Sequence, residues 1–122
     1  RVAYGHDAVF NAKAANSEGW MWRSDAMEAF EWAIFGVEVD GADIFPYSYG
    51  SDSGGGDTEW SQFFDALVDD LEIPIAVIAG NSGSSEYTIW EPGSNFNAIT
   101  VGYTDDLDTG LDRTDDILDS TS

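Results

Sequence analysis

Length, composition and charge limit what this chain can be. Its 122 residues, 43% of them hydrophobic, suffice for one domain with a hydrophobic core. Its net charge of −20, from 24 acidic residues against four basic ones, argues against nucleic-acid binding, which needs a basic patch. No stretch approaches the ~20 apolar residues of a membrane span. The absence of cysteine excludes disulfides, thiol catalysis and thiolate metal sites.

The acidic residues are scattered through the chain rather than gathered in a tail. This pattern predicts a folded domain with an acidic surface, which repels itself in dilute salt and is tolerated where salt screens it. We therefore expect a halophile protein from a salt-rich environment. The alternative is an acidic protein that binds cations or a basic partner. The chain begins with Arg1, which suggests a processed or excised product.

The first elements expected are a strand and a helix. Residues 8–14 suit a first strand. Ser24 can cap a helix that runs to Phe35, and Gly36 can end it. Three apolar residues fall on one face of this helix at helical spacing, namely Met27, Phe30 and Ile34.

A second strand is expected over residues 42–50. Pro46 lies inside it and removes a ladder donor, which favours an edge strand or a bulge. The following loop, residues 51–57, is rich in glycine and serine. It lacks the Lys-Ser/Thr ending of a phosphate-binding loop, so we reject that function for it.

The clearest element is a second helix, for which Thr58 is the expected cap. Its apolar residues follow the i, i+3, i+4, i+7 pattern: Trp60, Phe63, Phe64, Leu67, Val68 and Leu71. Polar residues are expected on the opposite side: Ser61, Gln62, Asp65, Asp69 and Glu72. Pro74 stops the helix.

The chain is organised around the stretch that follows Pro74. Residues 75–79 are an unbroken apolar run, typical of a parallel strand buried on both faces. The run breaks into Gly-Asn-Ser-Gly at residues 80–83. Ligands bind beyond the carboxyl ends of parallel strands, so Asn81 is a candidate functional residue. The alternative is that this segment is only a turn, since its residues favour turns.

The remaining elements complete an α/β pattern. A loop with a Pro92-Gly93 turn leads to a short strand over residues 98–103. Residues 104–122 carry seven aspartates and are expected to end without a closing element. The alternation of strands and helices predicts a single domain, residues 1–122, of the α/β class. It would have three layers, with a mostly parallel sheet and helices on both faces.

Five blocks resemble, in order, the central part of a subtilisin-like serine peptidase (subtilase). Residues 2–8 are similar to the family's GVAPDA lead into a core strand. Residues 41–50 resemble its GADVINMSLG strand, and residues 76–83 its VVVAAGNSG segment. Residues 92–102 resemble P…NAITVGA, and residues 119–122 the start of FSSxGP. The resemblance covers nearly the whole chain and implies a partial subtilisin-like fold.

The resemblance implies a function in peptide-bond hydrolysis. Asn81 matches the family's oxyanion-hole asparagine, whose side chain donates a hydrogen bond to the developing negative oxygen. One wall of the substrate cleft would be formed by Ser48, Tyr49 and Gly50. The other wall, at the primary specificity pocket, would be formed by Ile78, Ala79 and Gly80. Trp90 falls near the pocket base, where many members have a small residue, and would narrow the pocket; tryptophans more often serve as core.

The family's catalytic Asp, His and Ser blocks do not occur in this sequence. His6 lacks the surroundings of the triad histidine and is expected to be a loop residue. We therefore expect that this chain alone does not hydrolyse peptides. It would be part of a serine endopeptidase that contributes the oxyanion donor and part of the cleft. The alternatives are a non-catalytic acidic α/β binding module and an inactive subtilase homologue.

The acidic C-terminal segment raises the question of a bound metal ion. A third hypothesis is a calcium-binding acidic domain, because residues 106–112 offer side-chain oxygen ligands at alternate positions. That segment lacks the third ligand and the closing Glu of a helix-loop-helix site, so no metal residue is predicted. No cofactor is expected in this chain, although the resemblance allows calcium in the complete peptidase.

We expect a peptide or protein substrate, no nucleic acid and no membrane. The isolated chain should self-associate through exposed strand edges and apolar helix faces. By resemblance the location is extracellular.

Overall fold

The computed structural model describes most of the chain. The described residues are 8–36, 41–52, 55–105, 107, 113–114 and 116–118. His6, residues 108–112 and the terminal segments 1–7 and 119–122 lie outside them, so the expectations for those positions stay predictions. The chain forms two compact units, residues 1–43 and 44–122, and each is described by itself.

In the first unit, the expected strand over residues 8–14 is absent. This segment has no regular structure, and most of it is exposed, with Val9 74% exposed. The prediction was wrong because an apolar run only shows that a segment suits a pleated surface. A strand also needs a hydrogen-bonding neighbour, and the local sequence does not supply one.

The expected helix of the first unit is present as α1 (Arg23–Phe35). It begins one residue before Ser24, and its N-cap residue, Trp22, makes no side-chain capping bond, so the predicted cap was wrong. Gly36 ends the helix as predicted, and its backbone N–H donates to the Trp32 carbonyl at 2.7 Å. The buried stripe consists of Ala26, Phe30 and Ala33, with Met27 and Ile34 half-buried beside it.

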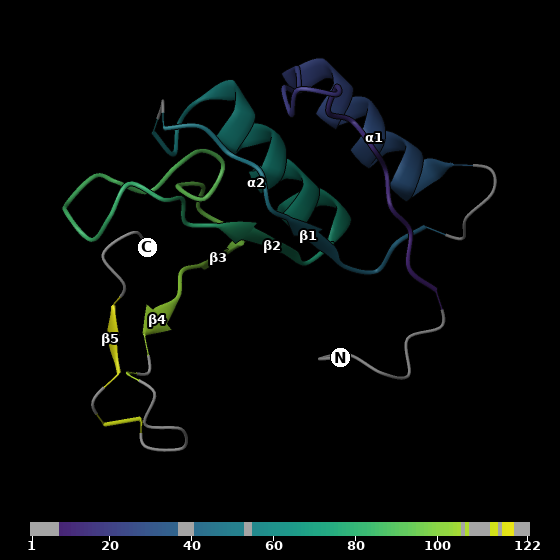
Figure 1. Cartoon of the computed structure of the whole chain (residues 1–122). Coiled ribbons are helices and arrows are strands. Elements are labelled where there is room, and N and C mark those ends of the chain that lie inside the picture. Colours follow the sequence, from purple (N-terminus) through teal and green to yellow (C-terminus); the bar gives the residue numbers. More distant parts are fainter. Residues whose placement is uncertain are drawn as a thin grey trace. The chain divides into compact units, whose positions relative to one another are not determined.

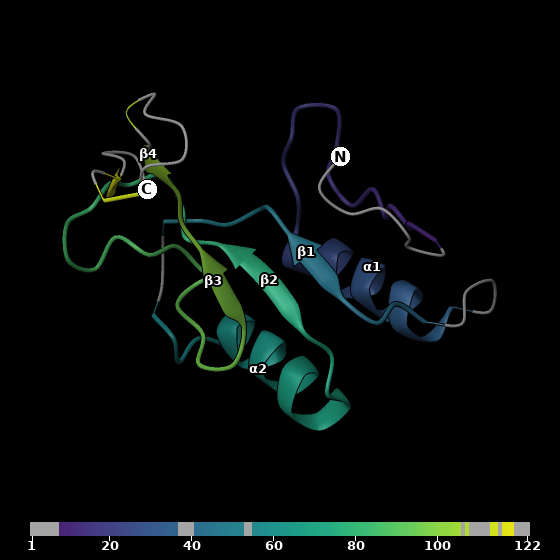
Figure 2. The ribbon, with the colours of Figure 1, turned by 90° about the horizontal axis from the view of Figure 1, so that it is seen from below.

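The second unit is built on a parallel sheet of three strands, β1 (Phe45–Tyr47), β2 (Ile75–Ile78) and β3 (Ile99–Val101). Their spatial order is β1-β2-β3, and both pairings are parallel (Figures 1 and 2). β1 is much shorter than the predicted strand over residues 42–50. It lies at the edge of this sheet, which is one of the two possibilities, an edge strand or a bulge, that the sequence favoured for a strand containing Pro46.

The second helix, α2 (Glu59–Leu71), lies along one face of this sheet (Figure 1). Thr58 caps it as predicted, because its side chain accepts a hydrogen bond from the Ser61 backbone N–H at 3.2 Å. The helix stops before Pro74, at Glu72 in a left-handed conformation. It packs on the sheet through an aromatic cluster of Tyr47, Trp60, Phe63 and Phe64, with ring centroids 5.0–6.1 Å apart.

Ser61 was expected on the polar side of α2 but is fully buried. Its position differs because its hydroxyl donates to the Gly55 carbonyl at 3.2 Å, so a buried polar atom has its partner. The loop before α2 therefore folds back over the first turn of the helix.

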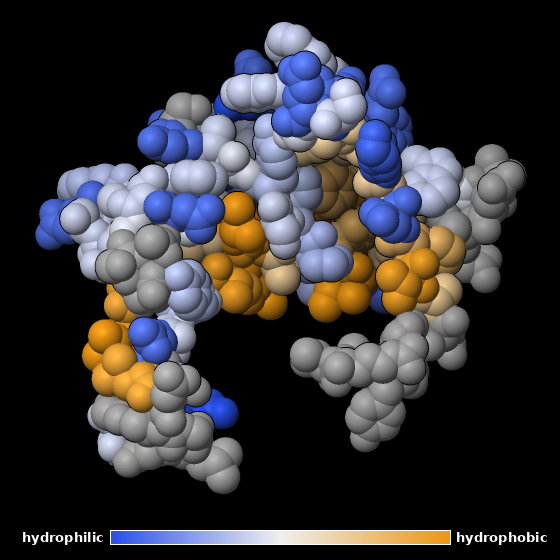
Figure 3. All heavy atoms as spheres, viewed as in Figure 1, coloured by the Kyte–Doolittle hydropathy of each residue, from blue (hydrophilic) through white to orange (hydrophobic). Residues whose placement is uncertain are grey.

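The burial of β2 alternates along the strand. Ile75 and Val77 are each 1% exposed, whereas Ala76 and Ile78 are half-buried. The expectation of full burial on both faces was thus right for the face toward α2 only. The register puts Ile99 beside Ala76 and Val101 beside Ile78, and these β3 side chains are more than half exposed. Hydrophobic side chains are visible at the level of the sheet in Figure 3.

The acidic C-terminal part contains one element that the sequence did not predict. β4 (Thr104–Asp105) pairs in antiparallel fashion with β5 (Ile117–Leu118). The expectation that residues 104–122 carry no closing element was wrong in this respect. Among the described helices, neither α1 nor α2 has the length and hydrophobicity to cross a bilayer. The parallel sheet with its helices confirms the α/β class and agrees with part of a subtilisin-like fold.

Candidate functional site

The site residues predicted from the sequence lie at the carboxyl ends of two neighbouring strands of the sheet. β1 and β2 are parallel neighbours in register, with Tyr47 opposite Val77. Their carboxyl ends therefore lie side by side, and the chain continues there into Ser48 from β1 and Ala79 from β2. This edge is where parallel α/β sheets bind ligands.

The segment that follows β2 is held by backbone hydrogen bonds. The Ala79 N–H donates to the Val101 carbonyl at 2.9 Å, and the Ala79 carbonyl accepts from the Trp90 N–H at 2.8 Å. Both polar backbone groups of Ala79 are thus used within the chain. The next residue, Gly80, has a φ of +110°, a conformation that glycine adopts readily and that turns the chain out of the sheet. Asn81 follows on the surface and is exposed.

Trp90 lies against the turn at Gly80. A Cβ atom placed on Gly80 would lie 2.6 Å from Cδ1 of the Trp90 indole, so the ring packs directly on the glycine backbone. The indole N–H donates to the Ser82 hydroxyl oxygen at 2.6 Å. Trp90 itself is half-buried. Trp90 therefore lies against Gly80 and Ser82, and its expected place at the base of a specificity pocket stays a prediction.

The segment that follows β1 meets the same loop one residue further on, at Glu91. Ser51 and Glu91 form an antiparallel bridge, with N–H to carbonyl distances of 3.0 and 2.9 Å. A Cβ atom on Gly50 would lie 2.6 Å from the Glu91 carbonyl oxygen, so only glycine allows this close approach. Gly50 and Tyr49 are half-buried, and Ser48 is exposed.

Glu91 is a buried carboxylate that the sequence reasoning missed. It is only 1% exposed, and the Thr58 hydroxyl donates a hydrogen bond to its Oε1. The acid lies at the N-terminal end of α2, where the helix dipole favours negative charge. The contact joins residues 33 positions apart, so no local pattern could have revealed it.

Tyr47, at the end of β1, has a clearly perturbed ionisation. Burial under α2, and to a lesser extent the neighbouring Tyr49, raises the pKa of its phenol above the ordinary value. Tyr47 therefore stays neutral at physiological pH and contributes packing rather than acid–base chemistry.

The structure thus brings together most of the predicted site. The β1 segment through Gly50 and the β2 segment through Gly80 both contact Trp90–Glu91. Asn81 follows Gly80 directly and is exposed. No histidine stands beside Ser48 or Ser82 in the described part of the chain, because the sole histidine, His6, lies outside it. Within the same residues, no three His, Asp or Glu side chains gather as a metal site would require.

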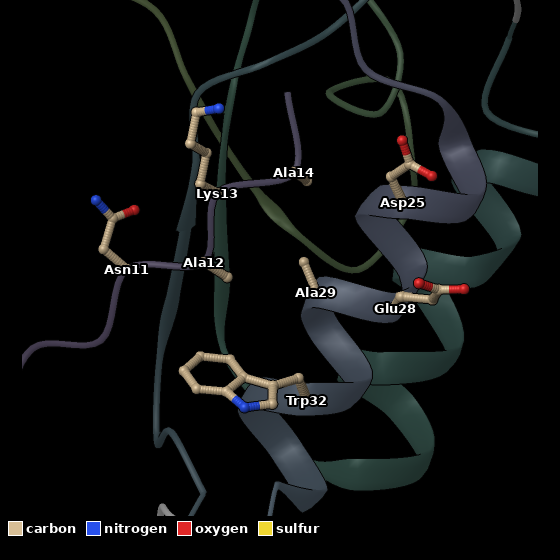
Figure 4. A pocket seen from close by; sticks show the side chains of 8 residues that line it. All are labelled: Asn11, Ala12, Lys13, Ala14, Asp25, Glu28, Ala29 and Trp32. Atoms are coloured by element: carbon tan, nitrogen blue, oxygen red, sulfur yellow. The ribbon is translucent and has the colours of Figure 1, made fainter. Parts of the chain in front are cut away.

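Two hollows lie elsewhere. The first, of about 460 Å³, belongs to the first unit and is formed by residues 11–14 and α1 (Figure 4). Ala29 and Trp32 point from the helix toward the extended segment, whereas Lys13 points away from Asp25 and Glu28. Because these charged groups do not converge, the hollow gives no reason to place chemistry there.

The second hollow, of about 470 Å³, lies between α2 and the starts of β2 and β3. Ile75 and Ile99 line it, and each is the first residue of its strand. It is therefore at the amino ends of the strands, opposite the edge that carries Asn81.

Comparison with known proteins agrees with this geometry. The model of the subtilase family, peptidase S8, matches residues 2–121. The serine protease AprX of Bacillus subtilis (strain 168) is 32% identical over 123 aligned positions, which include 93% of this chain and 27% of AprX. The chain thus spans about a quarter of the length of that relative. The family match over nearly the whole sequence shows that this chain belongs to the subtilase family.

Proposed function

We propose that this chain forms part of the substrate cleft of a subtilisin-like serine endopeptidase and supplies its oxyanion donor, Asn81. The observation that carries the proposal is the parallel register of β1 and β2, which brings the segment after Tyr47 and the segment after Ile78 to one edge of the sheet. The exposed Asn81 follows directly on this rigid support.

The proposed chemistry of Asn81 is electrostatic. When a nucleophile attacks the scissile carbonyl, its oxygen gains negative charge, and the neutral side-chain amide donates a hydrogen bond to it. Gly80 supports this role because its turn lifts Asn81 out of the sheet. The loss of such a donor typically lowers kcat by about 10²–10³. The nucleophile and the base would come from sequence blocks that this chain lacks, so the chain by itself is inactive in this proposal.

The proposal is tested in the complete polypeptide that contains this chain. Wild type and Asn81→Ala are assayed on a general peptide substrate in about 2–3 M salt, where an acidic surface is screened. A serine-directed covalent inhibitor identifies the hydrolysis as that of a serine peptidase. The matched control is Asn11→Ala, because Asn11 is exposed and is not a cleft residue.

We expect inhibitor-sensitive hydrolysis that falls about 100-fold or more in Asn81→Ala and is unchanged in Asn11→Ala. Hydrolysis that survives Asn81→Ala intact would remove Asn81 from the site. A folded polypeptide with no hydrolysis would instead favour the non-catalytic binding module or an inactive homologue. An extracellular location and adaptation to salt belong to the same proposal and are supported by the family and by the charge of −20.

A further inference from the structure

Trp90 holds both ends of the turn that carries Asn81. Its backbone N–H donates to the Ala79 carbonyl at 2.8 Å, and its indole N–H donates to the Ser82 hydroxyl oxygen at 2.6 Å. Ala79 and Ser82 stand on either side of the pair Gly80 and Asn81 in the chain. One residue therefore holds the start of the turn through its main chain and the end of the turn through its side chain.

The indole ring packs against the most adaptable residue of the same turn. Gly80 has a φ of +110°, and glycine has the widest choice of backbone conformations. A Cβ atom on Gly80 would lie 2.6 Å from Cδ1 of Trp90, so the ring is in direct contact with the glycine backbone. This contact restricts the conformations that Gly80 can adopt, and with them the direction in which the chain leaves β2.

The exposed position of Asn81 makes this support necessary. A turn on the surface, rich in glycine and serine, pays a conformational entropy cost for each backbone angle that is fixed. Without fixed ends, the turn would sample several conformations, and the Asn81 amide would point in a different direction in each. A hydrogen-bond donor stabilises a developing oxyanion effectively only when it is already oriented toward the place where the charge forms.

We propose that Trp90 is a positioning residue for Asn81. Its indole N–H, acting through the Ser82 hydroxyl, keeps residues 79–82 in the conformation from which the Asn81 amide can donate to the oxyanion. The inference rests on the proposed function, since it concerns the same asparagine. It depends on the polar N–H group of the indole and not on the size of the ring.

The hydrogen bond can be removed from either side with little other change. Trp90→Phe keeps an aromatic ring and the backbone N–H but lacks the indole N–H, and Ser82→Ala lacks the acceptor. Ser82→Thr is the conservative variant, because it keeps a hydroxyl. Ser84→Ala is the matched control, since Ser84 is an exposed serine of the same loop. All are made in the complete polypeptide, alone and together with Asn81→Ala, and are assayed on a general peptide substrate.

We expect kcat to fall about 2–10-fold in Trp90→Phe and in Ser82→Ala, with KM changed less than about twofold. Combining the two changes should lower kcat no further than either change alone, because both remove the same hydrogen bond. Ser82→Thr and Ser84→Ala should resemble wild type. Unchanged kcat in Trp90→Phe and Ser82→Ala, or a change confined to KM, would overturn the inference.

The Asn81→Ala background separates positioning from a general structural role. If Trp90 acts through Asn81, then Trp90→Phe and Ser82→Ala should have no further effect on kcat once the Asn81 amide is absent. The same 2–10-fold loss in this background would show that the hydrogen bond serves the fold and not the donor. That result would overturn the inference and leave the proposed function of Asn81 intact.

Should the polypeptide be inactive, or should Asn81→Ala hydrolyse as wild type does, the proposed function fails. The effect of Trp90 on the turn is then decided by hydrogen exchange of the segment that contains residues 79–83. Exchange about 2–10-fold faster in Trp90→Phe and Ser82→Ala than in wild type and Ser84→Ala would support a turn held by the indole. Equal exchange in all four proteins would overturn it.

Discussion

The Thr58 hydroxyl donates a hydrogen bond to the buried Glu91 carboxylate, and this contact joins the N-terminus of α2 to the loop that carries Trp90. The same hydroxyl accepts a hydrogen bond from the Ser61 backbone N–H, so the Thr58 side chain both caps the helix and holds the loop that carries Glu91. The backbone of Glu91 also bridges to Ser51, so this residue is tied to the N-terminus of α2 by its side chain and to the segment after β1 by its main chain.

Removal of the Glu91 carboxylate should destabilise the second unit. Glu91→Ala leaves the Thr58 hydroxyl without this acceptor, and we expect a loss of about 1–3 kcal/mol in the free energy of unfolding. The measurement is urea denaturation of the chain in molar salt. Glu86→Ala is the control, since Glu86 is exposed. In a double-mutant cycle with Thr58→Ala, purely additive losses would show that the two side chains do not interact.

The raised pKa of Tyr47 predicts a loss of stability at alkaline pH. The unfolded chain releases the Tyr47 proton near pH 10, whereas burial keeps the phenol protonated in the folded chain. The contribution is therefore fully present below pH 10 and is lost as the pH rises above it. Urea midpoints measured from pH 8 to 11.5 should fall less steeply in Tyr47→Phe than in wild type. Tyr87→Phe, at a fully exposed site, should follow wild type, and equal slopes for all three would contradict this explanation.

The charge of −20 predicts that the chain is stabilised by salt. The Debye length shortens from about 10 Å at 0.1 M to about 3 Å at 1 M, so repulsion between the carboxylates falls over this range. A relief of about 1 kcal/mol would raise the melting temperature by roughly 4 °C in a chain of this size. Thermal melts in NaCl, with sorbitol as an uncharged comparison, measure the effect. A melting temperature independent of NaCl would show that the acidic surface imposes no repulsive penalty.

Self-association is expected from the exposed apolar residues of β3. Ile99 is 60% exposed and Val101 54%, on the last strand of the described sheet. Light scattering in 2 M NaCl should give a mass that rises with concentration, and Ile99→Lys should lower it. Phe96→Lys is the control, because Phe96 is 81% exposed but lies outside the strands. A concentration-independent monomer mass for wild type would contradict the prediction.

Hydrophobic periodicity and the positions of capping and helix-breaking residues were enough to predict α2, its Thr58 cap and the central strand after Pro74. The proline at position 46 was likewise enough to favour an edge position for its strand. These features follow from local rules, since helical spacing, capping and the missing proline N–H act within a few residues. The same local rules failed for residues 8–14, where an apolar run had no strand to pair with. They also failed for β4 and β5, which have two residues each and are too short to give a periodic strand signal.

The sequence by itself singled out Asn81, because it follows a buried strand, and the resemblance to the subtilase blocks supplied the other residues of the proposed cleft. Only the tertiary structure decided what lies between them. The contacts of Trp90 with Gly80 and of Glu91 with Thr58 join segments distant in the chain, and their energies depend on burial and close approach. Such contacts arise when the parallel register brings the strand ends together, and no local pattern encodes that distance.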